Sequence, residues 1–152
     1  MMDKRGIEGL PLRLLVSSLV MALSAPALLG SLAYLDSMTA VDLAEREAEE
    51  LRASAISAFV GGPGNVRRVH VELRSGLSGA PCLRLGGGEG DPRSHQIDVL
   101  WSGEMVGSVP LAEPGFAICT PQGLPLMIEG SGWVELSCLQ GGEGPLVMAE
   151  MI

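Results

Sequence analysis

The most conspicuous pattern along the chain is an apolar run close to its N-terminus. Residues 14–35 read LLVSSLVMALSAPALLGSLAYL, 22 positions without a charged side chain. As an α-helix rising about 1.5 Å per residue, the run would be about 33 Å long, which matches a bilayer core of about 30 Å. Pro26 and Gly30 lie inside it, and membrane helices tolerate both, with a kink expected at Pro26. The run therefore predicts a membrane-spanning helix.

A second helical pattern follows the apolar run without a break. Between residues 36 and 60, apolar side chains recur at steps of three and four and so line one face of a helix. These positions are Val41, Ala44, Ala48, Leu51, Ala55 and Phe59. The helix is expected to stop at the Gly-Gly-Pro-Gly sequence that begins a linker over residues 61–65. We therefore expect one long helix over residues 7–60, apolar over 14–35 and amphipathic over 36–60.

After the linker, the hydrophobic pattern changes from helical to alternating. Residues 69–73 and 97–101 place apolar and polar side chains in turn, as in a strand with one buried face. Further strands, separated by turns with glycine or proline, are expected at residues 82–85, 104–111, 116–119, 124–129, 133–139 and 146–151. Residues 66–152 are thus predicted to form a small antiparallel, β-rich head of six to eight strands. The fold class is α+β.

The distribution of charge along the chain predicts how the protein is oriented in the membrane. The formal net charge is -8 and the pI about 4.7, so a nucleic acid would be repelled on average and is not an expected partner. All but two of the 18 acidic residues follow Leu35, whereas Lys4, Arg5 and Arg13 precede the apolar run. The positive-inside rule then puts the N-terminus in the cytoplasm and residues 36–152 outside the cytoplasmic membrane.

A short basic sequence ending in glycine stands just ahead of the apolar run. This tetrad, Lys4-Arg5-Gly6-Ile7, resembles the class III signal peptide of type IV pilin-like proteins, most closely the archaeal pilins and archaellins. In that family the apolar helix also continues as one amphipathic rod into a β-rich head. One departure is Pro11, which occupies the fifth mature position, where bacterial type IV pilins carry a glutamate.

The resemblance implies a processing step and a function. A prepilin peptidase would recognise the four residues of the tetrad and cut between Gly6 and Ile7, removing residues 1–6 as a leader. The mature chain would be a structural subunit, major or minor, of a type IV pilus-like surface filament, and its partners would be copies of itself or other pilins. Before assembly it would sit in the lipid bilayer through its apolar helix.

Two other interpretations of the N-terminal segment stay open. A plain signal anchor would leave the chain uncut, as a single-pass membrane protein whose outer domain binds a partner and does not polymerise. A secretory signal peptide would be cut after the small residues 24–27, giving a secreted domain that begins near Leu28. The N-terminus of the mature protein distinguishes the three.

The head contains three cysteines, Cys82, Cys119 and Cys138, in the part expected to face an oxidising exterior. Three pairings are open, and the pair Cys119–Cys138 is favoured, because Cys138 continues the inward face of its strand and Cys119 ends another strand. The alternative is three reduced cysteines.

Other candidate chemistry is sparse. His70 and His95 are far apart in the sequence, and no close cysteine or histidine pair accompanies them, so no metal site is expected. Glycine-rich runs at residues 61–64, 86–90 and 141–144 lack the phosphate-loop sequence and are expected to be turns. No catalytic motif or cofactor-binding motif is recognisable, and the chain is not expected to be an enzyme.

Overall fold

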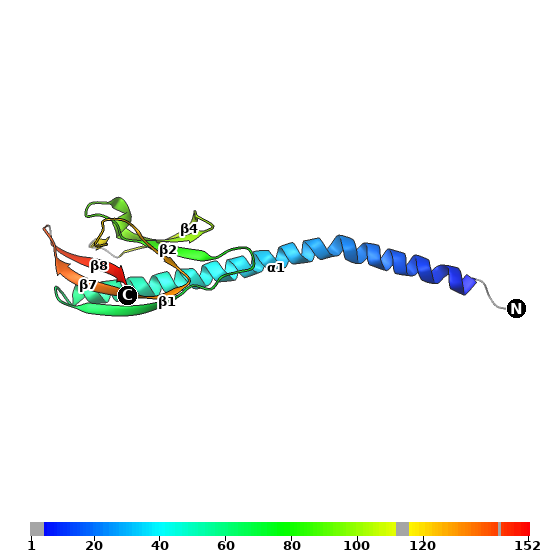
Figure 1. Cartoon of the computed structure of the whole chain (residues 1–152), viewed down its shortest axis with the longest axis horizontal. Helices are drawn as coiled ribbons and strands as arrows, with labels where there is room; N and C mark the ends of the chain where they lie inside the picture. The colour runs from blue at the N-terminus through cyan, green and yellow to red at the C-terminus, as the bar shows by residue number, and fades with distance from the viewer. Residues whose placement is uncertain (1–4, 112–115, 143) are drawn as a thin grey trace.

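One helix accounts for more than a third of the chain. The computed structural model of the protein describes residues 5–111, 116–142 and 144–152, with side chains from Leu12 onward. Helix α1 (Arg5–Val60) has 56 residues, about 84 Å at ~1.5 Å per residue. Its first half projects alone, and its second half lies against the β strands (Figure 1). We call residues 12–35 of this helix the stalk. The predicted single helix is confirmed, and it begins two residues before the expected start.

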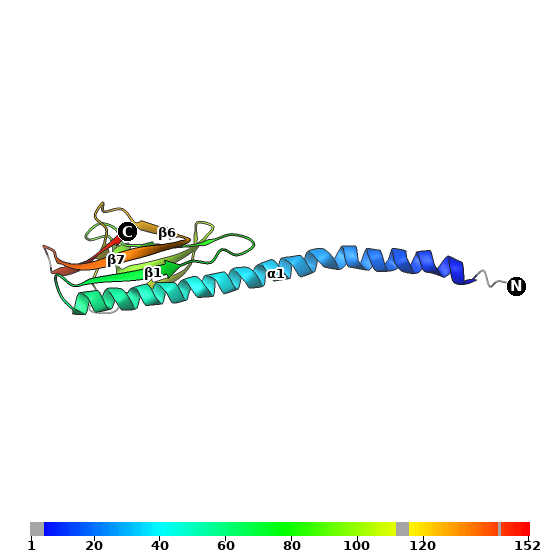
Figure 2. The ribbon, with the colours of Figure 1, turned by 60° about the horizontal axis from the view of Figure 1, so that its bottom comes forward.

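Two four-stranded sheets make up the rest of the head. The strands are β1 (Val66–Glu72), β2 (Pro81–Leu85), β3 (Gln96–Trp101), β4 (Glu104–Pro110), β5 (Ile118–Cys119), β6 (Leu126–Glu129), β7 (Ser131–Gln140) and β8 (Pro145–Met151). One sheet has the order β1-β7-β8-β5, and the other β4-β3-β2-β6. Figure 2 shows β1 and β7 running beside α1. All neighbours are antiparallel except β5 and β8. The α+β fold class is confirmed.

Each predicted strand segment overlaps an observed strand, and two strands begin two residues later than expected: β5, and β6, which starts at Leu126 where residue 124 was expected. The segment predicted over residues 116–119 is reduced to Ile118–Cys119. Phe116 is used differently: its ring stacks on that of Phe59 at the end of α1, with the centroids 4.7 Å apart. A short 3-10 helix, Pro92–His95, was not predicted. The Asp91 side chain caps it by accepting a hydrogen bond from the Arg93 amide, 2.9 Å away.

The second half of α1 belongs to the same hydrophobic core as the two sheets. Its buried face consists of Ala40, Ala44, Ala48, Leu51, Ala55 and Ala58. Five of these six side chains are methyl groups, so the helix backbone lies close to the sheets. The predicted face is confirmed at its four central positions. At its ends Ala40 and Ala58 are buried, while Val41 and Phe59 are only half buried.

The β3–β4 hairpin contains the one described non-glycine residue with a positive φ angle. Its two-residue turn is Ser102-Gly103, with φ angles of 52° and 86°. Two positive φ angles are typical of a type I′ turn, in which asparagine is strongly preferred over serine at the first position. We therefore expect Ser102→Asn to stabilise the head by about 0.5 kcal/mol. Thermal unfolding of the full chain in detergent micelles would measure this, and an unchanged or lower Tm would contradict it.

Candidate functional site

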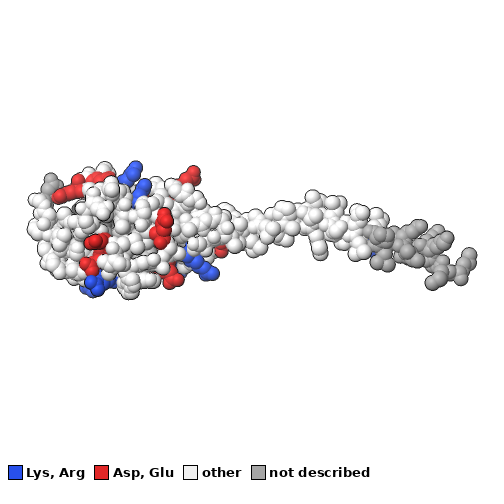
Figure 3. Space-filling view, viewed as in Figure 1, with Lys and Arg blue, Asp and Glu red and all other residues white. Residues whose placement is uncertain are grey.

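The stalk is an apolar rod that projects from the head, and none of its side chains over residues 12–35 is buried. Its exposed large apolar residues are Leu12, Leu14, Leu15, Val16, Leu19, Val20, Met21, Leu23, Leu28, Leu29, Leu32, Tyr34 and Leu35. In Figure 3 the charged side chains gather on the head. Within the stalk, Arg13 near its N-terminal end is the one charged residue. Monomeric soluble proteins rarely expose an apolar surface of this extent, so the stalk needs a covering. Among the described helices, α1 is long and apolar enough to cross a membrane.

The serine side chains of the stalk are satisfied within the helix itself. Ser17 donates to the Leu14 carbonyl oxygen at 3.0 Å, and Ser31 donates to the Ala27 carbonyl oxygen at 2.9 Å. Ser24 makes the same kind of bond to the Val20 carbonyl oxygen at 2.7 Å. Because these hydroxyl groups have backbone partners, they do not need water. The polar positions of the stalk are therefore compatible with a hydrocarbon surrounding.

The predicted processing site lies at the far end of the same helix. Lys4 is outside the described residues, whereas Arg5, Gly6 and Ile7 belong to the first turns of α1. The helical backbone thus runs through the Gly6–Ile7 bond without interruption. Pro26 does not end the helix either, and the stalk is gently bowed along its length (Figure 1).

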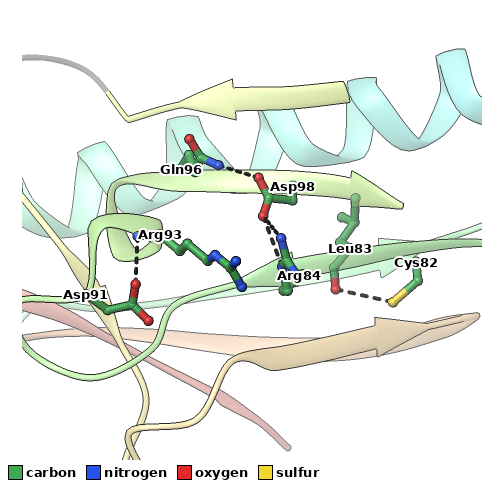
Figure 4. Close-up of polar contacts among 7 residues, drawn as sticks. All are labelled: Cys82, Leu83, Arg84, Asp91, Arg93, Gln96 and Asp98. Atoms are coloured by element: carbon green, nitrogen blue, oxygen red, sulfur yellow. Dashed lines mark hydrogen bonds and ion pairs between the residues drawn. The ribbon is translucent and has the colours of Figure 1, made fainter. Parts of the chain in front are cut away.

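A buried carboxylate in the head is the polar feature that sequence reasoning missed. Asp98 in β3 is almost completely buried, and it faces away from the core side of its sheet (Figure 4). Arg84 in β2 lies directly opposite and donates from Nε at 3.0 Å and from Nη2. Gln96 donates to the second carboxylate oxygen at 2.6 Å. Since both oxygens accept hydrogen bonds, the cluster is a structural ion pair. Only the strand register brings its members together, so their sequence spacing does not show it.

The structure does not form the favoured disulfide between Cys119 and Cys138. Strand β8 lies between β5 and β7, so the two residues are two strand spacings apart, about 10 Å, beyond the reach of a disulfide. They also point to opposite faces: Cys138 is paired with Val147, and Cys119 with Met148, the next residue along β8. All three cysteines are free.

The thiol groups are not activated by their surroundings. Burial raises the pKa of Cys119, and the charge of Glu89 raises it further. Burial also raises the pKa of Cys138 and, together with the nearby Glu129 carboxylate, that of Cys82. Because the thiolate is the reactive form, a raised pKa keeps these residues in the unreactive thiol form at neutral pH.

Each of the two histidines contacts an aromatic residue of the head. His70 in β1 packs on the ring of Trp133, with the centroids 5.0 Å apart. Nδ1 of His95 lies 3.2 Å from the carbonyl oxygen of Phe116. Within the described ranges, no three His, Cys, Asp or Glu side chains come together as metal ligands.

The glycine-rich runs connect elements of the fold. Residues 61–64 join α1 to β1, and residues 86–90 lead from β2 to the 3-10 helix. Gly62, Gly64, Gly86 and Gly90 take positive φ angles, as turns require. In the third run, 141–144, residue 143 lies outside the described residues.

An acidic groove of about 650 Å³ runs between α1 and β4. Its walls carry four carboxylates and one arginine, from Asp42, Glu45, Arg46, Glu49 and Glu50. It is wide and open to solvent. Its charges therefore interact weakly and add no chemistry beyond a negative surface.

Comparison of this chain with models of known protein families, with curated proteins and with solved structures gave no match.

Proposed function

We propose that this protein is a structural subunit, major or minor, of a type IV pilus-like surface filament, and that α1 anchors it in the cytoplasmic membrane before assembly. The proposal depends on one observation: the two halves of α1 have different surroundings. The stalk exposes its apolar side chains, and the rest of the same helix forms part of the head core. The tetrad Lys4-Arg5-Gly6-Ile7, just ahead of the stalk, supplies the signal for processing.

The physical argument for assembly starts from the stalk. A membrane covers it while the chain is a monomer, with the head outside and the N-terminus inside. When the chain leaves the lipid, neighbouring stalks would replace that cover and remove the same apolar area from water, at about 25 cal/mol per Å². Because α1 is continuous into the head core, stalk packing would fix the position of each head on the filament surface.

A second candidate is a single-pass anchored domain that never polymerises. Arg13 favours this candidate, because its side chain is exposed at the edge of the apolar run. There it can reach lipid headgroups, whereas a bundle of apolar helices would leave its charge without water. This candidate requires neither cleavage at Gly6 nor contact between stalks.

The N-terminus of the mature protein separates these candidates. We expect intact mass and N-terminal sequencing of the protein from its native membrane to show a chain that begins at Ile7. An uncut chain would support the plain anchor, and a chain that begins near Leu28 would support secretion.

Substitution of the predicted cleavage-site glycine provides a sharper test. Gly6→Leu is expected to abolish processing and filament formation, because a bulky side chain would stand at the cleavage position. Gly9→Leu is the matched control: it makes the same change three residues further on and should be processed normally. Mass spectrometry of both variants and electron microscopy of the cell surface would give the answer. Normal filaments from unprocessed Gly6→Leu would rule the proposal out.

A further inference from the structure

The end of the head nearest the stalk carries a loop that reaches along the helix. Residues 73–80, between β1 and β2, extend past the strands toward the N-terminal half of α1 (Figures 1 and 2). At the tip of the loop, the Leu77 amide donates a hydrogen bond to the carboxylate of Asp36. Asp36 directly follows the stalk. The loop tip is therefore held at the level at which the apolar run ends.

Four apolar side chains lie at this end of the head, and we call them the collar: Met38, Leu77, Trp101 and Val106. Leu77 is 79% exposed, and Met38 and Val106 are about half exposed. Trp101, Met38 and Val106 also line a mostly apolar hollow of about 210 Å³. The collar is thus continuous with the apolar stalk rather than scattered over the head.

The loop is held firmly against the helix and Trp101. Gly76 and Gly79 form an antiparallel bridge, with the Gly76 amide donating to the Gly79 carbonyl oxygen at 2.8 Å. A methyl group on Gly76 would lie 2.8 Å from Asp36 Oδ2, 3.2 Å from Trp101 Cη2 and 3.7 Å from Ala40 Cβ. Because these groups close around the glycine, the loop and the indole ring keep a fixed height relative to the helix.

We propose that the collar rests in the interfacial layer of the bilayer that the stalk spans, so that the head is seated on the lipid surface. Asp36 is one residue beyond the stalk and Ala40 five, which corresponds to about 1.5 and 7.5 Å along the helix. The interfacial layer on each side of the hydrocarbon core is about 5–8 Å thick. Leu77 then lies at the hydrocarbon boundary and Trp101 in the headgroup layer, where tryptophan is enriched. This inference rests on the membrane anchoring of the proposed function and not on filament assembly.

The two tryptophans of the chain provide a matched pair of probes. Trp133 pairs with His70 in β1, and His70 lies two residues from Glu72, on the side away from the stalk. The Glu72 amide donates a hydrogen bond to Glu47 of α1 at 3.1 Å. Glu47 is twelve residues past the stalk, so Trp133 lies more than about 18 Å above the end of the apolar run. Trp101 should therefore be in contact with lipid when Trp133 is not.

The test uses the full chain in phosphatidylcholine vesicles whose acyl chains carry bromine, a short-range quencher of tryptophan fluorescence. Three variants each keep one tryptophan: Trp133→Phe reports on Trp101, Trp101→Phe reports on Trp133, and the double Phe variant with Leu23→Trp reports on insertion of the stalk. We expect strong quenching of the Leu23→Trp probe, and several-fold stronger quenching of Trp101 than of Trp133. In the Trp133→Phe background, Leu77→Asp should weaken the quenching of Trp101, whereas Leu124→Asp, an exposed leucine at the other end of the head, should leave it unchanged.

Each other outcome overturns the inference, and the outcomes are distinguishable. If the Leu23→Trp probe is quenched but Trp101 is quenched no more than Trp133, the stalk is inserted and the head is not seated on the lipid. If the emission of Trp101 shifts to the blue with rising protein concentration and is not quenched, a second copy of the chain covers the collar. If the Leu23→Trp probe is itself unquenched, the membrane anchoring of the proposed function fails, and the seating of the head fails with it.

Discussion

Leu51→Ala is expected to lower the free energy of unfolding of the head by about 3 kcal/mol, because it removes a buried isobutyl group and leaves a cavity. Leu51 is the one large side chain on the buried face of α1, and it is 0% exposed between Ala48 and Ala55. The alanines around it allow close approach of the helix to the sheets, so neighbouring side chains have little freedom to fill the space. Urea denaturation of the full chain in detergent micelles, followed by tryptophan fluorescence, would measure the loss.

Leu124→Ala is the control for this experiment. It removes the same atoms from a leucine that is 66% exposed, and it should change the free energy of unfolding by less than about 0.5 kcal/mol. Equal losses in the two variants would contradict the described packing of α1 against the sheets. They would instead suggest that the helix and the β strands form separate units.

Arg84→Met is expected to destabilise the head by about 3–5 kcal/mol, since it leaves the buried Asp98 carboxylate without its charged partner. Gln96 would then be the one described side chain that donates to Asp98. Replacing both partners, in Arg84→Met/Asp98→Leu, should recover most of the loss, because no charge remains to be buried. The same denaturation experiment in micelles applies.

The exposed ion pair between Arg68 and Glu135 is the control for the buried one. Arg68 Nε lies 2.9 Å from Glu135 Oε2, and the Arg68 side chain is 65% exposed. Because water replaces the lost partner, Arg68→Met should cost about 1 kcal/mol or less. A double variant of the buried pair that is as unstable as Arg84→Met would show that the arginine stabilises the head through packing rather than through its charge.

Local patterns in the sequence were sufficient to predict the long helix and the position of each strand, but not the 3-10 helix Pro92–His95. The single helix, the end of that helix at Gly61 and the eight strand segments each depend on spacing or on turn residues within a short stretch. Two further exceptions have tertiary causes. Phe116 continues a strand-like pattern, but it packs on Phe59, so the strand begins only at Ile118. Ala40 is buried and Val41 is not, because the path of the sheets across the helix decides which side chains are covered.

The cysteines and the buried ion pair depend on strand order, which no local pattern contains. By sequence, Cys138 continues the inward face of one strand and Cys119 ends another, which favoured a disulfide between them. In the structure β8 lies between their two strands and keeps them apart. Arg84 and Asp98 are 14 residues apart and become neighbours only because β2 and β3 pair in one register.

The sequence by itself determined that this protein has an apolar segment in need of cover, an amphipathic continuation and a β-rich head, because hydrophobic periodicity is a local property of the chain. Only the tertiary structure decided that the head is built around the second half of the helix, and that a loop 41 residues away in the sequence meets Asp36 at the end of the stalk. Those contacts depend on how the strands cross over one another in space. The collar consequently could not be predicted from any single segment of the chain.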